Sequence, residues 1–109
     1  MLGVRVMICR YADASFPGWV ECRLVDALGQ EHMFVEKVPV VTMGDVDATT
    51  SLPQAGLIAC IVLGKSEHDD TRQLVRIDTR TPWGIESTAG RSQFDVLLEQ
   101  LCELRWEGE

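Results

Sequence analysis

Apolar and polar side chains alternate most clearly in two runs of the chain, residues 19–25 and 31–37. Alternation with a period of two places one set of side chains on a buried face and the other set in water. The sequence between the runs, Ala27-Leu28-Gly29-Gln30, has the residue types of a turn. Together these segments predict a β-hairpin.

Further segments alternate in the same way or form an uninterrupted apolar run: residues 4–10, 56–64, 73–78, 83–87 and 92–96. In the first of them, Val4, Val6 and Ile8 share one face. The run 56–64 is almost entirely apolar, which predicts a strand covered on both faces, and the segment after it completes a second hairpin. The last two segments predict a third hairpin around a turn at residues 88–91.

Two stretches fit this pattern less well. Residues 38–41 are expected to continue the second strand of the first hairpin. Pro39 cannot donate a hydrogen bond, so it predicts an edge or a bulge at that point. Residues 42–54 lack periodicity and predict a long loop, and the sequence leaves open whether this loop is ordered.

The C-terminal part of the chain fits two structures. Phe94 and Val96 continue a strand, whereas Phe94, Leu97 and Leu101 also have helical spacing. We expect a strand of the third hairpin followed by a short helix that begins near Leu97. Whether residues 92–97 are strand or helix stays open at this point.

The expected fold class follows from the number of strands. The sequence predicts six or seven short strands with turns at short intervals, and no helical segment before residue 92. The protein is expected to be mainly β: a small antiparallel barrel-like sheet with a short C-terminal helix. The 109 residues form a single domain, 1–109, in this interpretation.

The net charge of −7, from 17 acidic and 10 basic residues, narrows the partners. A surface of this sign repels phosphate backbones, so we expect no binding to nucleic acid or to anionic membranes. A basic protein partner is compatible with the charge. Arg5 interrupts the apolar N-terminal residues before they could form a signal peptide, and no apolar stretch approaches the roughly 20 residues of a membrane span. A cytoplasmic location is therefore expected.

The four cysteines, Cys9, Cys22, Cys60 and Cys102, are widely and irregularly spaced. We expect reduced thiols that pack as small apolar side chains. Two disulfides are the alternative, had the protein been exported.

Two histidines, His32 and His68, are the weak candidates for a metal site, with Glu36, Asp69 and Asp70 as carboxylate ligands. Their spacing has no ligand signature, so the simpler interpretation is an exposed strand histidine and a solvated acidic loop. No cofactor and no catalytic residue is predicted.

Trp83 stands between Pro82 and Gly84 beside an expected turn. An aromatic side chain at a barrel rim either caps the core or borders a binding mouth. In the second case Asp78, Arg80 and Glu86 would line a shallow pocket with Trp83, and this is the preferred small-ligand site.

If the C-terminal residues are helical, Asp95, Glu99, Glu103 and Glu107 form one acidic ridge. Such a ridge is either a solvated helix face or a surface for a basic partner. In the second case Trp106 would be an exposed aromatic anchor.

Most of the chain from Trp19 onwards resembles an uncharacterised family of small bacterial proteins, for which no activity is assigned. The segments that carry the resemblance are Val20-Glu21-Cys22-Arg23-Leu24-Val25-Asp26-Ala27, Glu36-Lys37-Val38-Pro39-Val40, Pro82-Trp83-Gly84-Ile85-Glu86-Ser87-Thr88 and Phe94-Asp95-Val96. The second half is also similar to SH3-like and other small β-barrels, which implies architecture and no chemistry.

These observations lead to a non-catalytic, acidic interaction module that binds a protein partner or itself, through an exposed strand edge or the acidic ridge. The alternative is a small-ligand or metal-binding β-barrel, with an enzyme as one form of it, whose site combines Trp83 with a histidine. A third hypothesis, mimicry of nucleic acid towards a basic toxin, follows from the charge alone.

Overall fold

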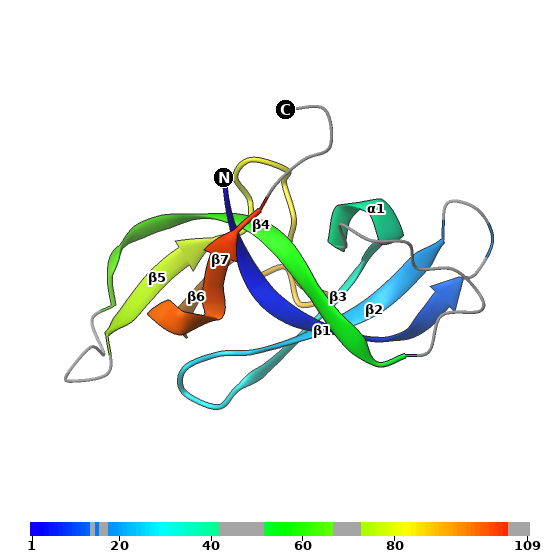
Figure 1. The fold of residues 1–109 in the computed structure, drawn as a ribbon, viewed down its shortest axis with the longest axis horizontal. Helices are drawn as coiled ribbons and strands as arrows, with labels where there is room; N and C mark the ends of the chain where they lie inside the picture. Colours follow the sequence, from blue (N-terminus) through cyan, green and yellow to red (C-terminus); the bar gives the residue numbers. More distant parts are fainter. Residues whose placement is uncertain (14, 16–17, 42–51, 67–72, 105–109) are drawn as a thin grey trace.

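The structure is a computed structural model, and it describes residues 1–13, 15, 18–41, 52–66 and 73–104. The described strands are β1 (Leu2–Asp13), β2 (Trp19–Val25), β3 (Glu31–Lys37), β4 (Gln54–Lys65), β5 (Leu74–Asp78), β6 (Gln93–Leu97) and β7 (Leu101–Glu103). They pair antiparallel in the order β3-β2-β1-β4-β5-β6, and β7 pairs with β1. The sheet curls into a half-barrel (Figure 1), so the predicted mainly β, barrel-like fold is confirmed.

The first hairpin forms as its alternating pattern predicts. β2 and β3 pair over their whole length, with Cys22 opposite Phe34 and Leu24 opposite His32. The side chains of all four residues are buried. At the turn, the amide of Asp26 donates to the carbonyl of Gln30 across 2.9 Å, which closes the two strands.

β1 lies at the centre of the sheet and pairs with three other strands. Val4, Val6 and Ile8 are buried on its inner face, as predicted. Where β4 passes this face the packing requires a glycine. A Cβ atom at Gly56 would lie 2.5 Å from the carbonyl oxygen of Val41 and 2.9 Å from the side chain of Ile8.

Residues 38–41 do not continue the strand as expected. They form a helical turn, α1 (Val38–Val41), which buries Val38 and Val41. Pro39 explains the change, because it has no amide for a sheet and its fixed φ suits the first turn of a helix. The amide of Val38 donates to the carbonyl of Gly18 instead. Of the expected loop 42–54, residues 42–51 lie outside the described residues.

Within the apolar run 56–64, residues 56–60 are buried or partly buried and residues 61–64 are exposed, so the prediction of a covered strand is wrong for the second part of the run. β1 begins at Leu2, which lies opposite Cys60. From Ile61 onwards β4 runs past the start of β1 and pairs with β5 alone among the described residues. In Figure 1 the green ribbon of β4 continues past the N terminus in this way. An apolar run therefore reaches water here.

The prediction of the second hairpin is confirmed, since β4 pairs with β5. The prediction of a third hairpin is wrong. Residues 83–87 form no strand, and β6 pairs with β5 instead. Hydrogen bonds around Thr79 turn the chain back at this point: its carbonyl accepts from the amide of Ile85, and its hydroxyl donates to the carbonyl of Ile85. The predicted turn at 88–91 is present and is closed by a 2.7 Å bond from the amide of Ser87 to the carbonyl of Arg91.

Residues 93–97 are the strand β6, and the helical part that follows is one 3₁₀ turn, η1 (Leu98–Gln100). The side chain of Gln100 accepts from the amide of Leu97 and donates to the carbonyl of Val25, which fixes this turn on the first hairpin. The chain then returns to the sheet as β7, beside the N-terminal end of β1.

Candidate functional site

A polar groove of about 450 Å³ lies between the β2–β3 turn, β5, β6 and the connection between β5 and β6. Its side chains come from three separate parts of the chain: Asp26, Leu28, Gln30, Arg76, Arg80, Arg91, Ser92, Gln93, Phe94 and Asp95, with Gly90 at its edge. The volume falls within the range of small-ligand sites in proteins.

Asp26 and His32 form a buried pair at one side of this groove. The Nε2 atom of His32 lies 2.8 Å from Oδ2 of Asp26, and the two side chains are only 7% and 6% exposed. The other carboxylate oxygen of Asp26 accepts from the amides of Leu28 and Gln30. The ring of His32 packs against that of Phe94 at 4.6 Å between centroids. The interpretation of His32 as an exposed strand residue is therefore wrong, because it faces the core beside Leu24.

Asp95 was expected on an acidic helical ridge, and the structure corrects this. Its side chain is 5% exposed and accepts two hydrogen bonds from Arg76, at 2.9 and 3.0 Å. Glu99 lies in η1 and Glu103 in β7, so these acids share no helix face with Asp95. Both faces of β6 are covered at this point, since Phe94, Asp95 and Val96 are all buried, so Asp95 is buried although it points to the opposite face from its two neighbours. Trp106 and Glu107 lie outside the described residues.

The predicted pocket around Trp83 is only partly assembled. Oδ1 of Asp78 accepts from the amide of Arg80, and Nη2 of Arg80 lies 3.3 Å from Oε1 of Glu86. Trp83 is half-buried and packs against the hydrophobic core, which fits the alternative that it caps the core. Of the four residues, Arg80 alone lines the groove described above.

A metal site has no support in the described residues, where no group of three or more His, Cys, Asp or Glu side chains could hold an ion. His32 is bound to Asp26, and Glu36 is a partly buried residue whose pKa is raised by burial. His68, Asp69 and Asp70 lie outside the described residues, so their part of the hypothesis is not addressed.

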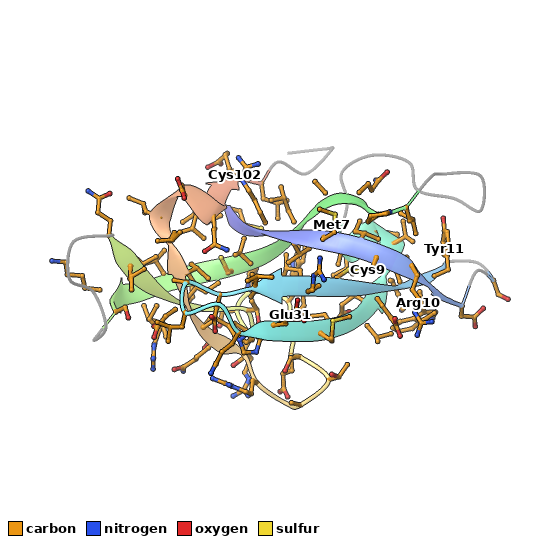
Figure 2. All side chains as sticks on the ribbon, turned by 90° about the horizontal axis from the view of Figure 1, so that it is seen from below. Met7, Cys9, Arg10, Tyr11, Glu31 and Cys102 are labelled. Atoms are coloured by element: carbon orange, nitrogen blue, oxygen red, sulfur yellow. The ribbon has the colours of Figure 1, made fainter. Side chains whose placement is uncertain are left out.

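All four cysteines are free thiols, and two of them are buried in the core. Burial raises the pKa of Cys22 to about 12 and that of Cys60 to about 11, so both stay protonated at neutral pH. A protonated thiol is a poor nucleophile and a poor metal ligand. Cys9 and Cys102 are half-buried and lie apart along the long axis of the molecule (Figure 2). The prediction of thiols that pack as apolar side chains fits Cys22 and Cys60.

The second surface feature is the outer end of β4. Ile61, Val62 and Leu63 are 38%, 40% and 47% exposed, although they are consecutive residues of one strand. The register of β4 on β5 shifts between Val62 and Gly64, so Leu63 is the extra residue of a bulge. Among the described strands, only β5 pairs with this segment. An exposed apolar strand with an open edge is a site for pairing with another chain.

Sequence reasoning missed most of the groove. Arg76, Arg91 and Asp26 were not singled out, because each lies in a different segment and nothing in their spacing signals that they meet. Asp26 carried one usable signal: an aspartate at the start of a turn tends to accept hydrogen bonds from backbone amides two to four residues later.

We compared the chain with protein-family models, with curated proteins and with solved structures, and none of the three comparisons gave a match. The resemblance to the small bacterial family therefore stays a prediction. In the described part of the chain, no helix has both the length and the apolar character that crossing a membrane requires.

Proposed function

We propose that the protein is a non-catalytic interaction module of the cytoplasm, which binds another protein or a second copy of itself through the outer end of β4. The observation that carries this proposal is the exposure of Ile61, Val62 and Leu63 beside an edge of the sheet that no other described strand covers.

Backbone hydrogen bonding supports this choice of surface. An open strand edge presents amide and carbonyl groups that an extended segment of a partner can pair with, as in β-strand addition. Pairing would also cover the three aliphatic side chains. Completing the burial of side chains that are now about 40% exposed contributes about 1 kcal/mol each.

The charge of the chain selects among partners. At −7 the protein repels nucleic acid and anionic membranes, whereas a protein segment with basic residues is attracted. The acidic ridge is no longer the contact surface in this proposal, since Asp95 is buried against Arg76. Burial raises the pKa values of the core thiols Cys22 and Cys60, which makes these two cysteines poor nucleophiles.

The test replaces Val62 by lysine and compares this variant with the same substitution at a valine of similar exposure outside the proposed surface. Val25, on β2, is 42% exposed against 40% for Val62, so it is the matched control. In sedimentation equilibrium we expect concentration-dependent association of the wild type, which Val62→Lys abolishes and Val25→Lys leaves unchanged.

If the wild type is monomeric, a second experiment tests for a different protein as the partner. A photo-crosslinking amino acid is placed at position 62 or at position 25, and the protein is crosslinked inside the cells that express it. A discrete protein adduct at position 62 that is absent at position 25 supports a protein partner. A monomeric wild type with no adduct specific to position 62 refutes the proposal.

A further inference from the structure

Basic side chains gather in the groove of this acidic protein. Three of the ten basic residues of the chain, Arg76, Arg80 and Arg91, line it. Guanidinium groups of like charge repel one another, and they are held together here by different contacts. What each arginine already binds decides what the groove can accept.

Arg76 is committed to Asp95. Its Nε and Nη2 atoms donate to the two oxygens of that buried carboxylate in a bidentate pair. Such pairs are strong and geometrically fixed, so Arg76 forms part of the wall and its charge is balanced.

Arg80 and Arg91 are held more weakly. Arg80 has one 3.3 Å contact to Glu86, with side chains 59% and 44% exposed, and an exposed pair of this kind contributes little. The guanidinium of Arg91 lies over the ring of Phe94, 6.0 Å from its centroid, and within the described ranges it forms no ion pair. Both side chains can therefore donate hydrogen bonds to a ligand in the groove.

The two acids in the groove are already satisfied. Asp95 is balanced by Arg76, and both oxygens of Asp26 accept hydrogen bonds from His32 and from two backbone amides. The carboxylate of Asp26 keeps its negative charge, but its oxygens are turned to these internal donors. Among the described residues that line the groove, Arg91 is the guanidinium without an ion pair.

We propose that this groove binds a small oxyanion, a phosphate or carboxylate group that bridges Arg80 and Arg91 and displaces Glu86 from Arg80. Guanidinium groups match both anions in geometry. The polar residues Gln30, Gln93 and Ser92 line the rest of the groove. This site differs from the small-ligand site predicted around Trp83. It does not depend on the proposed binding at the strand edge of β4.

The experiment titrates ¹⁵N-labelled protein with inorganic phosphate or with citrate at constant ionic strength, and follows backbone amides and arginine Nε–H groups by NMR. We expect saturable shifts confined to residues 80 and 90–95, with a dissociation constant below about 10 mM. Saturation by one probe alone tells whether the group is a phosphate or a carboxylate. Linear shifts with both probes, or shifts at every arginine, overturn the proposal.

Two substitutions with opposite effects sharpen the test. Arg91→Gln is expected to weaken binding about tenfold, because it removes a charge-assisted hydrogen bond. Glu86→Gln is expected to tighten binding about threefold, because it removes the carboxylate that competes for Arg80. The spectrum of each variant shows whether it is folded.

The pair Arg23–Glu31, at 3.4 Å and also exposed, is the matched control. Arg23→Gln and Glu31→Gln change the net charge by the same amounts as the two variants in the groove, and they should leave the affinity within about twofold. If Arg23→Gln weakens binding as much as Arg91→Gln, or if Glu86→Gln does not tighten it, the proposed site is wrong.

Discussion

Replacing Asp26 by alanine tests how the β2–β3 turn and one side of the groove are held. The carboxylate of Asp26 accepts three hydrogen bonds: 2.9 Å from the amide of Leu28, 2.9 Å from the amide of Gln30 and 2.8 Å from Nε2 of His32. The substitution removes all three acceptors and leaves the buried imidazole without a partner.

The expected loss of stability follows from these contacts. Each of the two amides lies at a partly buried turn, where water can replace the lost partner, and costs about 1 kcal/mol. The side chain of His32 is only 7% exposed, so water cannot replace Asp26 as its partner. Leaving its Nε2 atom without a hydrogen bond costs about 1–3 kcal/mol of stability. Asp26→Ala should therefore lower the free energy of unfolding by about 3–5 kcal/mol. Asp26→Asn keeps an oxygen for the two amides and should lose only about 1–2 kcal/mol.

The assay is urea unfolding followed by tryptophan fluorescence. With a slope of about 1–3 kcal/mol per molar urea, a loss of 4 kcal/mol moves the midpoint by about 2 M. Asp13→Ala is the control, because Asp13 accepts one hydrogen bond in an exposed turn and should cost less than about 0.5 kcal/mol. Equal midpoints for Asp26→Ala and Asp26→Asn would show that the three hydrogen bonds do not stabilise the turn as argued.

Two further predictions concern the core. Gly56→Ala should destabilise the protein by about 1–3 kcal/mol in the same urea assay, because the new Cβ would lie 2.5 Å from a carbonyl oxygen, whereas Gly3→Ala, with its nearest contact at 3.3 Å, should cost less. Equal losses at the two positions would contradict the packing argument. In native protein at pH 8, buried Cys22 should react with iodoacetamide far more slowly than half-buried Cys9, because burial excludes the reagent and raises the pKa of Cys22 from its ordinary value of 9 to about 12, which lowers the thiolate fraction of Cys22 about 1,000-fold. Mass spectrometry of the labelled peptides measures both rates, and labelling of Cys22 as fast as that of Cys9 would show that Cys22 is not buried as described.

Alternation predicted the parts of the fold where one face of a strand is buried and the other is wet. β2, β3 and the inner face of β1 follow this rule, and the sequence located them closely. The prediction that residues 56–64 form a strand covered on both faces failed in its second part. An apolar run indicates only hydrophobicity and does not tell where the neighbouring strand begins. The start of β1 at Leu2 decides which part of that run is covered.

Predictions for the site failed for a related reason. Periodicity assigned Asp95 to a solvated ridge, yet the residue is buried, because Arg76 on the neighbouring strand lies directly opposite it and supplies the charge. Such a pairing requires that β6 lies beside β5, whereas the sequence analysis paired residues 92–96 with 83–87. A change of strand partner changes which side chains lie opposite one another, so the pair of Arg76 and Asp95 could not be inferred from that hairpin.

The net charge of the chain is therefore a poor guide to the chemistry of any one surface. An excess of seven acids predicts basic partners, and the strand edge of β4 is compatible with such a partner. The groove differs from this average, because the carboxylates of Asp26 and Asp95 are turned to internal donors whereas Arg91 is left without an ion pair among the described residues. What a surface binds depends on the charges that the fold leaves unpaired there, and two surfaces of one acidic protein can then select ligands of opposite sign.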